Sequence, residues 1–334
     1  MRLAKRIAPK VRESLVGFLM RAAEANHMQS TSVLHTFLGR KSRPPAIEET
    51  ERLALFCGCS AEEVAQLFGF QVHRQDGGRA WRLGEEWVTK ESFVSSRTMA
   101  VCCECLCDDP HLPGTWELTF YCCCAFHRTR LLTVCPDCGK QLSWTRPKVW
   151  QCGCGFDFRR AKTGPGTPYA WLTAELIEHS LDPGFRVTIP TEVSHRVVDR
   201  LGRLSLDGLF KTIWFLGHCV GGFDTCTSGH GRLKRKEGHA ETSIDTAFSL
   251  LSRWPESLHE RLDALSRRPG VEGGRGLYRR MFGPIVSYLE QEPANGELVF
   301  IRLTYEQEIR RLWRIRGRKP PRQLGYQLEM DIGS

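Results

Sequence analysis

The cysteine-rich stretches CCECLCDD (102–109), CAFHRTRLLTVCPDCGKQL (124–142) and CGCGFDF (152–158) organise the middle of this 334-residue chain. The chain has 15 cysteines, and eleven of them fall between Cys102 and Cys154. Closely spaced cysteine pairs in a reducing compartment are typical of metal ligands, whereas a secreted scaffold uses its cysteines for disulfides. The odd total also argues against complete disulfide pairing. We therefore interpret these stretches as metal-binding modules.

Four ligand pairs can be read from the spacing, because residues two or three positions apart reach one ion from a single tight turn. The pairs, in chain order, are Cys102 with Cys105, Cys124 with His127, Cys135 with Cys138, and Cys152 with Cys154. They predict two zinc sites, one with three cysteines and a histidine and one with four cysteines. Between the first two pairs, GTWELTFYC (114–122) is β-prone and suits a joining hairpin.

Some alternatives stay open at this level. Four further cysteines offer other registers for the first site: Cys103, Cys107, Cys122 and Cys123. Iron–sulfur ligation fits less well, since a histidine ligand and zinc-knuckle spacing favour zinc. Both sites have four protein ligands, whereas a catalytic zinc keeps a position open for water or substrate. We therefore predict two structural Zn²⁺ ions and no catalytic residue.

The region before the cysteines is predicted to be helical. ESLVGFLMRAAEANHM places Leu15, Phe18, Leu19 and Ala22 on one helical face, and STSVLHTFLG predicts a second short helix. Further on, Gly58 lies in a turn, and Ser60 with Glu63 forms a capping-box pair that marks a helix start. Helix, short turn and capped helix is the layout of a helix-turn-helix, although many such pairs only pack a core.

Helical periodicity returns beyond the TGPGTP linker (163–168), from EVSHRVVDRLGRL (192–204) to the C-terminal end, with a Gly-rich surface loop expected at 221–240. We expect residues 71–100 to form strands or loops. The expected fold is mainly α with small β zinc-ribbon modules. Its predicted parts are an N-terminal helix-turn-helix-like domain (1–100), tandem zinc fingers (101–160) and a helical C-terminal domain (161–334).

Charge and missing motifs narrow the function. The formal charge is +9, which fits nucleic-acid contact. A basic run near the C-terminal end provides either phosphate contacts or a solvated helix face: Arg310, Arg311, Arg314, Arg316, Arg318 and Lys319. The sequence lacks a GxxxxGK[ST] phosphate loop and the HExxH, GxSxG and deaminase signatures. No secretory signal or membrane-length apolar stretch is found, so we expect a cytoplasmic protein.

The motifs resemble those of the TniQ/TnsD family of bacterial transposon target-selection proteins. ESLVGFLMRAAEAN (13–26) resembles the family's opening motif, and CCECLCDD, Trp116 with CAFHRTRLLTVCPDCGKQL, and CGCGFDF resemble its zinc block in order and spacing. AFSLLSRWPESLHERLDAL (247–265) is similar to a later helix pair of the family. In this chain Cys103 and Ala125 stand where the family usually has prolines.

The resemblance implies a non-enzymatic adaptor for DNA transposition. Such a protein marks the target DNA, directly or through a CRISPR RNA-guided complex, and recruits the transposon's AAA+ ATPase. A homodimer is among the forms it implies. Two other functions stay open from the residues themselves: a zinc-stapled DNA-binding transcriptional regulator, and a carboxylate-site nuclease with structural zincs.

Overall fold

The computed structural model divides the chain into two compact units. It describes residues 2–28, 31, 49–74, 78–94, 99–143, 146, 148–221, 239–268, 277–293 and 296–317. The first unit comprises Met1–Pro190, Ser205–Asp207 and Leu233–Glu241, and the second comprises Thr191–Leu204, Gly208–Arg232 and Thr242–Ser334, each over its described residues. The three-part division expected from the sequence stays a prediction.

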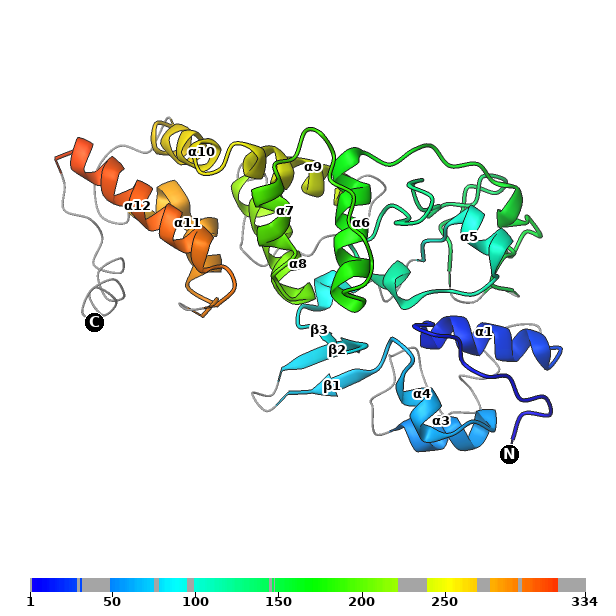
Figure 1. Cartoon of the computed structure of the whole chain (residues 1–334). Coiled ribbons are helices and arrows are strands. Elements are labelled where there is room, and N and C mark those ends of the chain that lie inside the picture. Colours follow the sequence, from blue (N-terminus) through cyan, green and yellow to red (C-terminus); the bar gives the residue numbers. More distant parts are fainter. Residues whose placement is uncertain are drawn as a thin grey trace. The chain divides into compact units, whose positions relative to one another are not determined.

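Three helices form the core of the N-terminal part of the first unit (Figure 1). They are α1 (Leu15–Ala25), α3 (Thr50–Cys57) and α4 (Ala61–Ala65). The predicted apolar face of the first helix is confirmed, because Leu15, Phe18, Leu19 and Ala22 are all at most 3% exposed. Three of these four pack in one cluster with apolar side chains of α3 and α4. Burial of this face stabilises three helices that are too short to be stable alone.

The turn between α3 and α4 matches the local prediction. Gly58 adopts the left-handed conformation with φ +74°, which suits glycine because it has no Cβ. The Ser60 hydroxyl accepts from the Glu63 amide at 3.1 Å, and the Glu63 carboxylate accepts from the Ser60 amide at 2.7 Å. The helix that follows has only five residues and carries Glu62 and Glu63 in its first turn. The helix predicted at 30–39 lies almost wholly outside the described residues.

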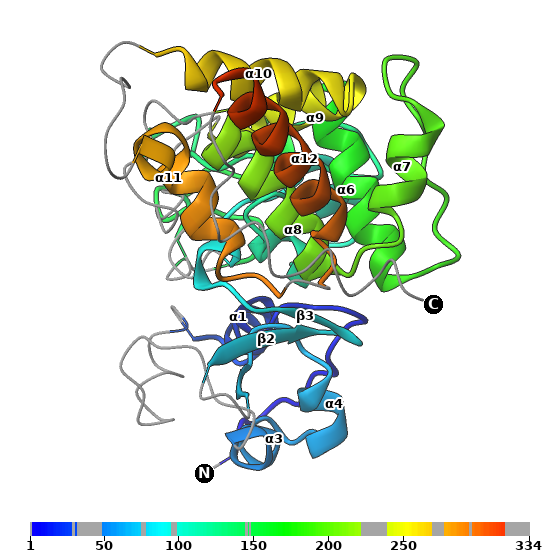
Figure 2. The same cartoon turned by 90° about the vertical axis from the view of Figure 1, so that its left-hand side faces the viewer.

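A small antiparallel sheet follows the helices (Figure 2). Its strands are β1 (Gln71–His73), β2 (Arg79–Leu83) and β3 (Glu86–Val88), in that order. Gly84, with φ +60°, starts the two-residue connection between β2 and β3. Ala80, Trp81 and Leu83 are buried, so the central strand contributes its apolar side chains to the core.

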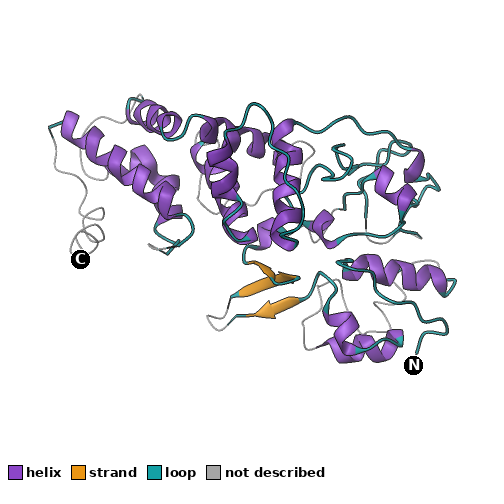
Figure 3. Ribbon diagram, in the orientation of Figure 1, coloured by secondary structure: helices purple, strands orange, loops and turns teal. Residues whose placement is uncertain are grey.

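Residues 101–160 consist mainly of loops (Figure 3). The regular elements here are α5 (Cys103–Asp108) and two 3-10 helical turns, Gly114–Glu117 and Phe158–Arg160. The β hairpin predicted at 114–122 was wrong. Every residue from Gly114 to Tyr121 is buried, and strand propensity mainly reflects packing on a half-exposed pleated surface. The ribbon-like pairing in this region is limited to isolated bridges, such as Val134 with Gln141.

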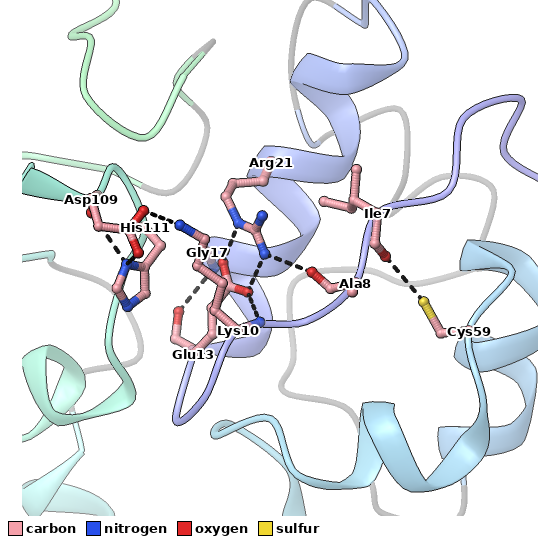
Figure 4. A network of polar contacts seen from close by, with 10 residues as sticks. Ile7, Ala8, Lys10, Glu13, Gly17, Arg21, Cys59, Asp109 and His111 are labelled. Atoms are coloured by element: carbon pink, nitrogen blue, oxygen red, sulfur yellow. Dashed lines mark hydrogen bonds and ion pairs between the residues drawn. The ribbon is translucent and has the colours of Figure 1, made fainter.

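The N-terminal segment ties α1 to the metal-binding loops (Figure 4). Lys10 forms an ion pair through its ammonium group with Asp109, which follows α5, and its amide donates to the Glu13 carboxylate at 2.9 Å. Arg21 of α1 donates to both oxygens of Glu13, at 2.7 and 2.6 Å. The Cys59 thiol donates to a carbonyl of the same segment at 3.3 Å. Polar contacts therefore join α1, the α3–α4 turn and α5 within one unit.

Helix α6 (Pro168–Leu181) was not predicted from the sequence. It begins at Pro168, the last residue of the predicted linker, and the preceding residue, Thr167, caps the helix. Glu175 of this helix pairs with Arg128 at 2.9 Å, and Glu178 accepts from the Tyr121 hydroxyl at 2.8 Å. Arg128 and Tyr121 flank the Cys124–His127 turn, so α6 supports that turn from one side.

The second unit is helical, as predicted for the C-terminal part. Its helices are α7 (His195–Leu201), α8 (Leu206–Trp214) with a π-helical extension (Phe215–Val220), α9 (His239–Ser252), α10 (Glu256–Ser266), α11 (Leu277–Leu289) and α12 (Val299–Ile315). The first residues of α8 and α9 are counted in the first unit. Most of the loop predicted at 221–240 lies outside the described residues.

Helix α10 packs against α11 and α12 in the second unit (Figure 2), and aromatic side chains of α11 and α12 contact one another. Phe282 lies 6.2 Å from Tyr305 and 6.3 Å from Trp313 between ring centroids. Helix α11 is kinked at Phe282, two residues before Pro284, which cannot donate a helical hydrogen bond. None of the helices in the described part of the chain has the length and hydrophobicity that a membrane span requires.

Candidate metal centres

The first centre brings together Cys102, Cys105, Cys124 and His127, the predicted set of three cysteines and one histidine. Cys102 caps the N-terminus of α5, and its sulfur accepts from the Cys105 amide at 3.5 Å. The sulfur of Cys124 likewise accepts from the His127 amide at 3.4 Å. Each pair thus lies on one tight turn whose amides point at the first sulfur. The three sulfurs and the His127 nitrogen lie within 4.8 Å of one another.

The distances within this centre match those of a tetrahedral zinc site. The Cys105 and Cys124 sulfurs are 3.5 Å apart, and His127 Nδ1 lies 3.5, 3.2 and 3.5 Å from the three sulfurs. Tetrahedral zinc, with Zn–S of about 2.3 Å and Zn–N of about 2.0 Å, requires S···S of about 3.8 Å and S···N of about 3.5 Å. A disulfide would require about 2.05 Å between sulfurs. The donor set and its spacing therefore fit Zn²⁺.

A carboxylate stands behind the histidine. Asp108, at the end of α5, lies with one oxygen 3.4 Å from His127 Nε2, so an exposed carboxylate is close to the ring nitrogen that faces away from the sulfurs. Such a contact sets the tautomer and the orientation of a metal-binding imidazole. Sequence reasoning did not assign this role to Asp108. The available signal was its position three residues after Cys105, which places both on one side of a helix.

The second centre brings together Cys135, Cys138, Cys152 and Cys154, the predicted set of four cysteines. The Cys135 and Cys154 sulfurs are 3.7 Å apart, and those of Cys138 and Cys152 are 3.8 Å apart. Both values are close to the edge of about 3.8 Å expected for zinc with four sulfur ligands. Gly139 follows the first pair with φ +67°, and its amide donates to the Cys135 carbonyl at 2.9 Å. Only a residue tolerant of a positive φ closes this turn without strain.

The alternative cysteine registers are not brought together. Among the described residues, the candidate metal clusters do not include Cys103, Cys107, Cys122 or Cys123. Burial raises the pKa of Cys103 to about 12 and raises the pKa of Cys123 as well. Cys107 is exposed and donates to the Arg159 carbonyl at 3.6 Å.

A buried arginine stands beside the second centre. Arg146 is 3% exposed and donates to the carbonyls of Val149 at 2.6 Å and Lys148 at 3.1 Å. Its Nη1 is buried without a hydrogen-bond partner among the described residues. Burial lowers the pKa of Arg146 to about 9, and the nearby Cys152 opposes this shift. Four thiolates around one Zn²⁺ carry a net charge of −2, so a buried guanidinium whose Nη1 has no hydrogen-bond partner among the described residues fits a metal-loaded centre.

The predicted basic run divides into side chains with different surroundings. Arg311 donates to the buried Glu308 carboxylate at 2.8 Å, and Arg316 donates to the Ser266 carbonyl at the end of α10. Arg310 also has an intramolecular interaction. Arg314 is exposed. Arg318 and Lys319 lie outside the described residues. Arg311 and Arg316 therefore contribute to the fold of the second unit, and the nucleic-acid role of the run stays a prediction.

Comparison with known families gives one assignment. The TniQ family profile matches residues 4–131. The matched segment spans α1, α3, α4, the small sheet and all four residues of the first centre, and it ends just before the second centre. No curated protein matches the chain. On this match, residues 4–131 form a TniQ domain, which suggests a transposition-associated protein.

Proposed function

We propose that both centres hold structural Zn²⁺ and that the eight residues named above are its ligands. The support is the donor set, the tetrahedral spacing, the carboxylate near His127 and the buried Arg146 guanidinium beside the second centre. Structural zinc contributes on the order of 10–16 kcal/mol of apparent binding free energy in small modules. A domain has only about 5–15 kcal/mol of net stability. Zinc removal should therefore unfold residues 101–160.

Elemental analysis of purified protein tests this part of the proposal. We expect two zinc ions per chain, and a strong chelator should abolish the cooperative thermal unfolding of the metal-binding region. A single zinc, or a melting profile unchanged by chelation, would contradict it. X-ray absorption should show one centre with three sulfurs and one nitrogen and another with four sulfurs.

We propose further that the protein is a non-enzymatic adaptor that marks the DNA target for transposition and recruits the transposon's AAA+ ATPase. The TniQ match is the observation that carries this proposal. The ligand sets agree with an adaptor, because four protein ligands around each ion leave no position for water or substrate. The zinc ions then serve to hold loops in place, and the surfaces of these loops become available for partners.

The route to the target DNA is part of the proposal. The protein marks the site directly or through a CRISPR RNA-guided complex, and a homodimer would present two copies of each surface. Helix α4, the second helix of the predicted helix-turn-helix, is better suited to contact a protein than DNA, because it is short and its first turn is acidic. A phosphate backbone repels carboxylates and requires cations. Arg314 of α12 is a better candidate for phosphate contact, because its side chain is exposed.

The deciding experiment is a pull-down of a transposon AAA+ ATPase, with and without target DNA. We expect the zinc-loaded protein to retain the ATPase, more strongly when DNA is present. The matched control is protein that carries Cys138→Ser, which lacks one ligand of the second centre. Failure to retain the ATPase under any condition would refute the adaptor role. Tight, sequence-specific gel shifts without a partner would instead favour a transcriptional regulator, and metal-dependent DNA cleavage would favour a nuclease.

A further inference from the structure

A groove of about 450 Å³ lies in the second unit between α7, the end of α9 and α12. Its volume is in the range that holds several side chains of a ligand or peptide. The floor and walls include Leu251, Trp254, Phe300 and Leu303. The Trp254 and Phe300 rings pack edge to face at 5.6 Å, so the apolar floor is ordered by its own contacts.

The groove continues onto an exposed apolar strip of α12. Val299 and Leu303 are 38% and 37% exposed, and their spacing of four residues places them on the same helical face. Exposed aliphatic side chains are common singly, but a pair beside an apolar groove marks a contact surface. Covering such surface is worth about 25 cal/mol per Å². The strip therefore favours an apolar partner.

The charge of the groove is one-sided. Arg196 and Arg200 of α7 line one edge, and none of the described residues that line it is acidic. Both arginines are exposed. The Arg200 guanidinium lies 4.9 Å from the centre of the Phe300 ring, which holds it at the margin of the apolar floor. Four residues apart, the two cations are about one helical turn, or 6 Å, from each other.

We infer that this groove binds an acidic amphipathic segment of a partner protein, with bulky aliphatic or aromatic side chains in the groove and two carboxylates on Arg196 and Arg200. A helix with glutamates four residues apart matches the spacing of the two arginines, and a helix in an apolar groove is a recurrent form of peptide recognition. Nucleic acid fits poorly, since two cations beside an aliphatic strip neutralise few phosphates. This inference does not depend on the zinc ions or on the transposition role.

Fluorescence polarisation tests the inference with the full-length, zinc-loaded protein. The probe is a fluorescein-labelled amphipathic peptide of about 14 residues, with leucine and phenylalanine on one face and glutamate pairs four apart beside it. Its control has lysine in place of every glutamate. We expect micromolar binding of the acidic peptide and at least about tenfold weaker binding of the basic one, a tenfold change being about 1.4 kcal/mol.

Charge exchange identifies the site. Arg196→Glu combined with Arg200→Glu should weaken the acidic peptide at least about tenfold and strengthen the basic peptide. Leu303→Asp should weaken both. The matched control is Arg267→Glu combined with Arg279→Glu, which changes the net charge equally at exposed positions outside the groove; it should leave binding unchanged.

Three results would overturn the inference. They are no saturable binding of the acidic peptide, equal binding of the two peptides, and unchanged binding in the Arg196/Arg200 variant. Analytical sedimentation separately tests whether a second copy of this chain occupies the groove. Self-association that is lost on Leu303→Asp, without peptide binding, would assign the groove to a second copy of this chain and refute the heterologous partner.

Discussion

Replacing Glu13 by glutamine tests whether the polar network of Figure 4 holds the first unit together. Glu13 is 0% exposed. Its carboxylate accepts from Arg21 Nε at 2.7 Å, from Arg21 Nη2 at 2.6 Å and from the Lys10 amide at 2.9 Å. Glutamine keeps the shape of the glutamate side chain but has no charge, and its amide nitrogen would face hydrogen-bond donors of Arg21 or Lys10. Arg21, which is 18% exposed at its side chain, would then be a cation without its counter-charge.

The expected loss follows from these contacts. Each hydrogen bond to a charged group contributes about 1.5–3 kcal/mol, and removing one partner of a buried ion pair costs about 3–5 kcal/mol. Because Arg21 retains partial access to water and its bond to a backbone carbonyl at 3.0 Å, we expect a loss of about 3 kcal/mol in the free energy of unfolding. In a unit of this size, that lowers Tm by about 6–12 °C.

Urea denaturation of Glu13→Gln, Arg21→Met and the double variant measures the coupling in a double-mutant cycle. We expect a coupling of at least about 2 kcal/mol, with the double variant less destabilised than the sum of the two single changes. Zinc content should remain that of the wild type. The control pair, Arg253 with Glu260, is 64% and 60% exposed at its side chains and should couple by less than about 1 kcal/mol. A Glu13→Gln protein within about 0.5 kcal/mol of wild type would refute the reasoning.

Five other substitutions probe the metal centres, α6 and α12. Cys138→Ser should remove zinc from the second centre only, so elemental analysis should fall from about two ions to one, because each centre has its own ligands. Arg146→Met should speed chelator-driven zinc release from the second centre at least about tenfold, because the thiolates lose a buried counter-charge. The rate of zinc release from the first centre should not change. An equal increase in the rate at both centres would contradict this prediction. Burial raises the pKa of Glu178 in the folded protein above its ordinary value of 4.5. The protonated carboxyl therefore stabilises the fold fully below pH 4.5, and this stabilisation is lost as the pH rises through the raised pKa of the folded state. Glu178→Gln should remove this part of the pH dependence from a series of unfolding free energies measured at different pH values. Arg311→Ala should destabilise the second unit by about 1–3 kcal/mol, because it removes the arginine that pairs with a buried carboxylate, whereas Arg314→Ala should leave Tm unchanged and weaken only salt-dependent DNA binding.

The segment matched by the TniQ family and the first compact unit of the structure end at different residues. The TniQ match ends at residue 131, after the first centre. The compact unit continues through the second centre and α6 to Pro190. Glu175 and Glu178 of α6 bind side chains on either side of the Cys124–His127 turn. A fragment cut at residue 131 would expose these partners, so α6 belongs to the folded context of the first centre.

The cysteine and histidine pairs that the structure brings together could be read from the sequence alone because the geometry within each pair is local. Two ligands separated by two residues, followed by Gly139 or supported by backbone amides, form the same tight turn in almost any surroundings. The capping box of Ser60 and Glu63 is local in the same sense, and so is the apolar periodicity of α1. In each case the interaction joins residues within about one helical turn, so the spacing in the chain already defines the distance in space.

Tertiary structure decided what depends on distant partners. The choice of Cys102 and Cys105 over Cys103 follows from the fold, which brings the sulfurs of Cys102 and Cys105 together with Cys124 and His127 and leaves Cys103 outside the cluster. The β-prone stretch after Pro113 became a 3-10 turn because it is enclosed on all sides. Arg311 of the predicted basic run donates to the buried Glu308 carboxylate and is therefore engaged within the protein. Burial and long-range pairing set the free energies of these groups, and neither is encoded in the spacing of residues along the chain.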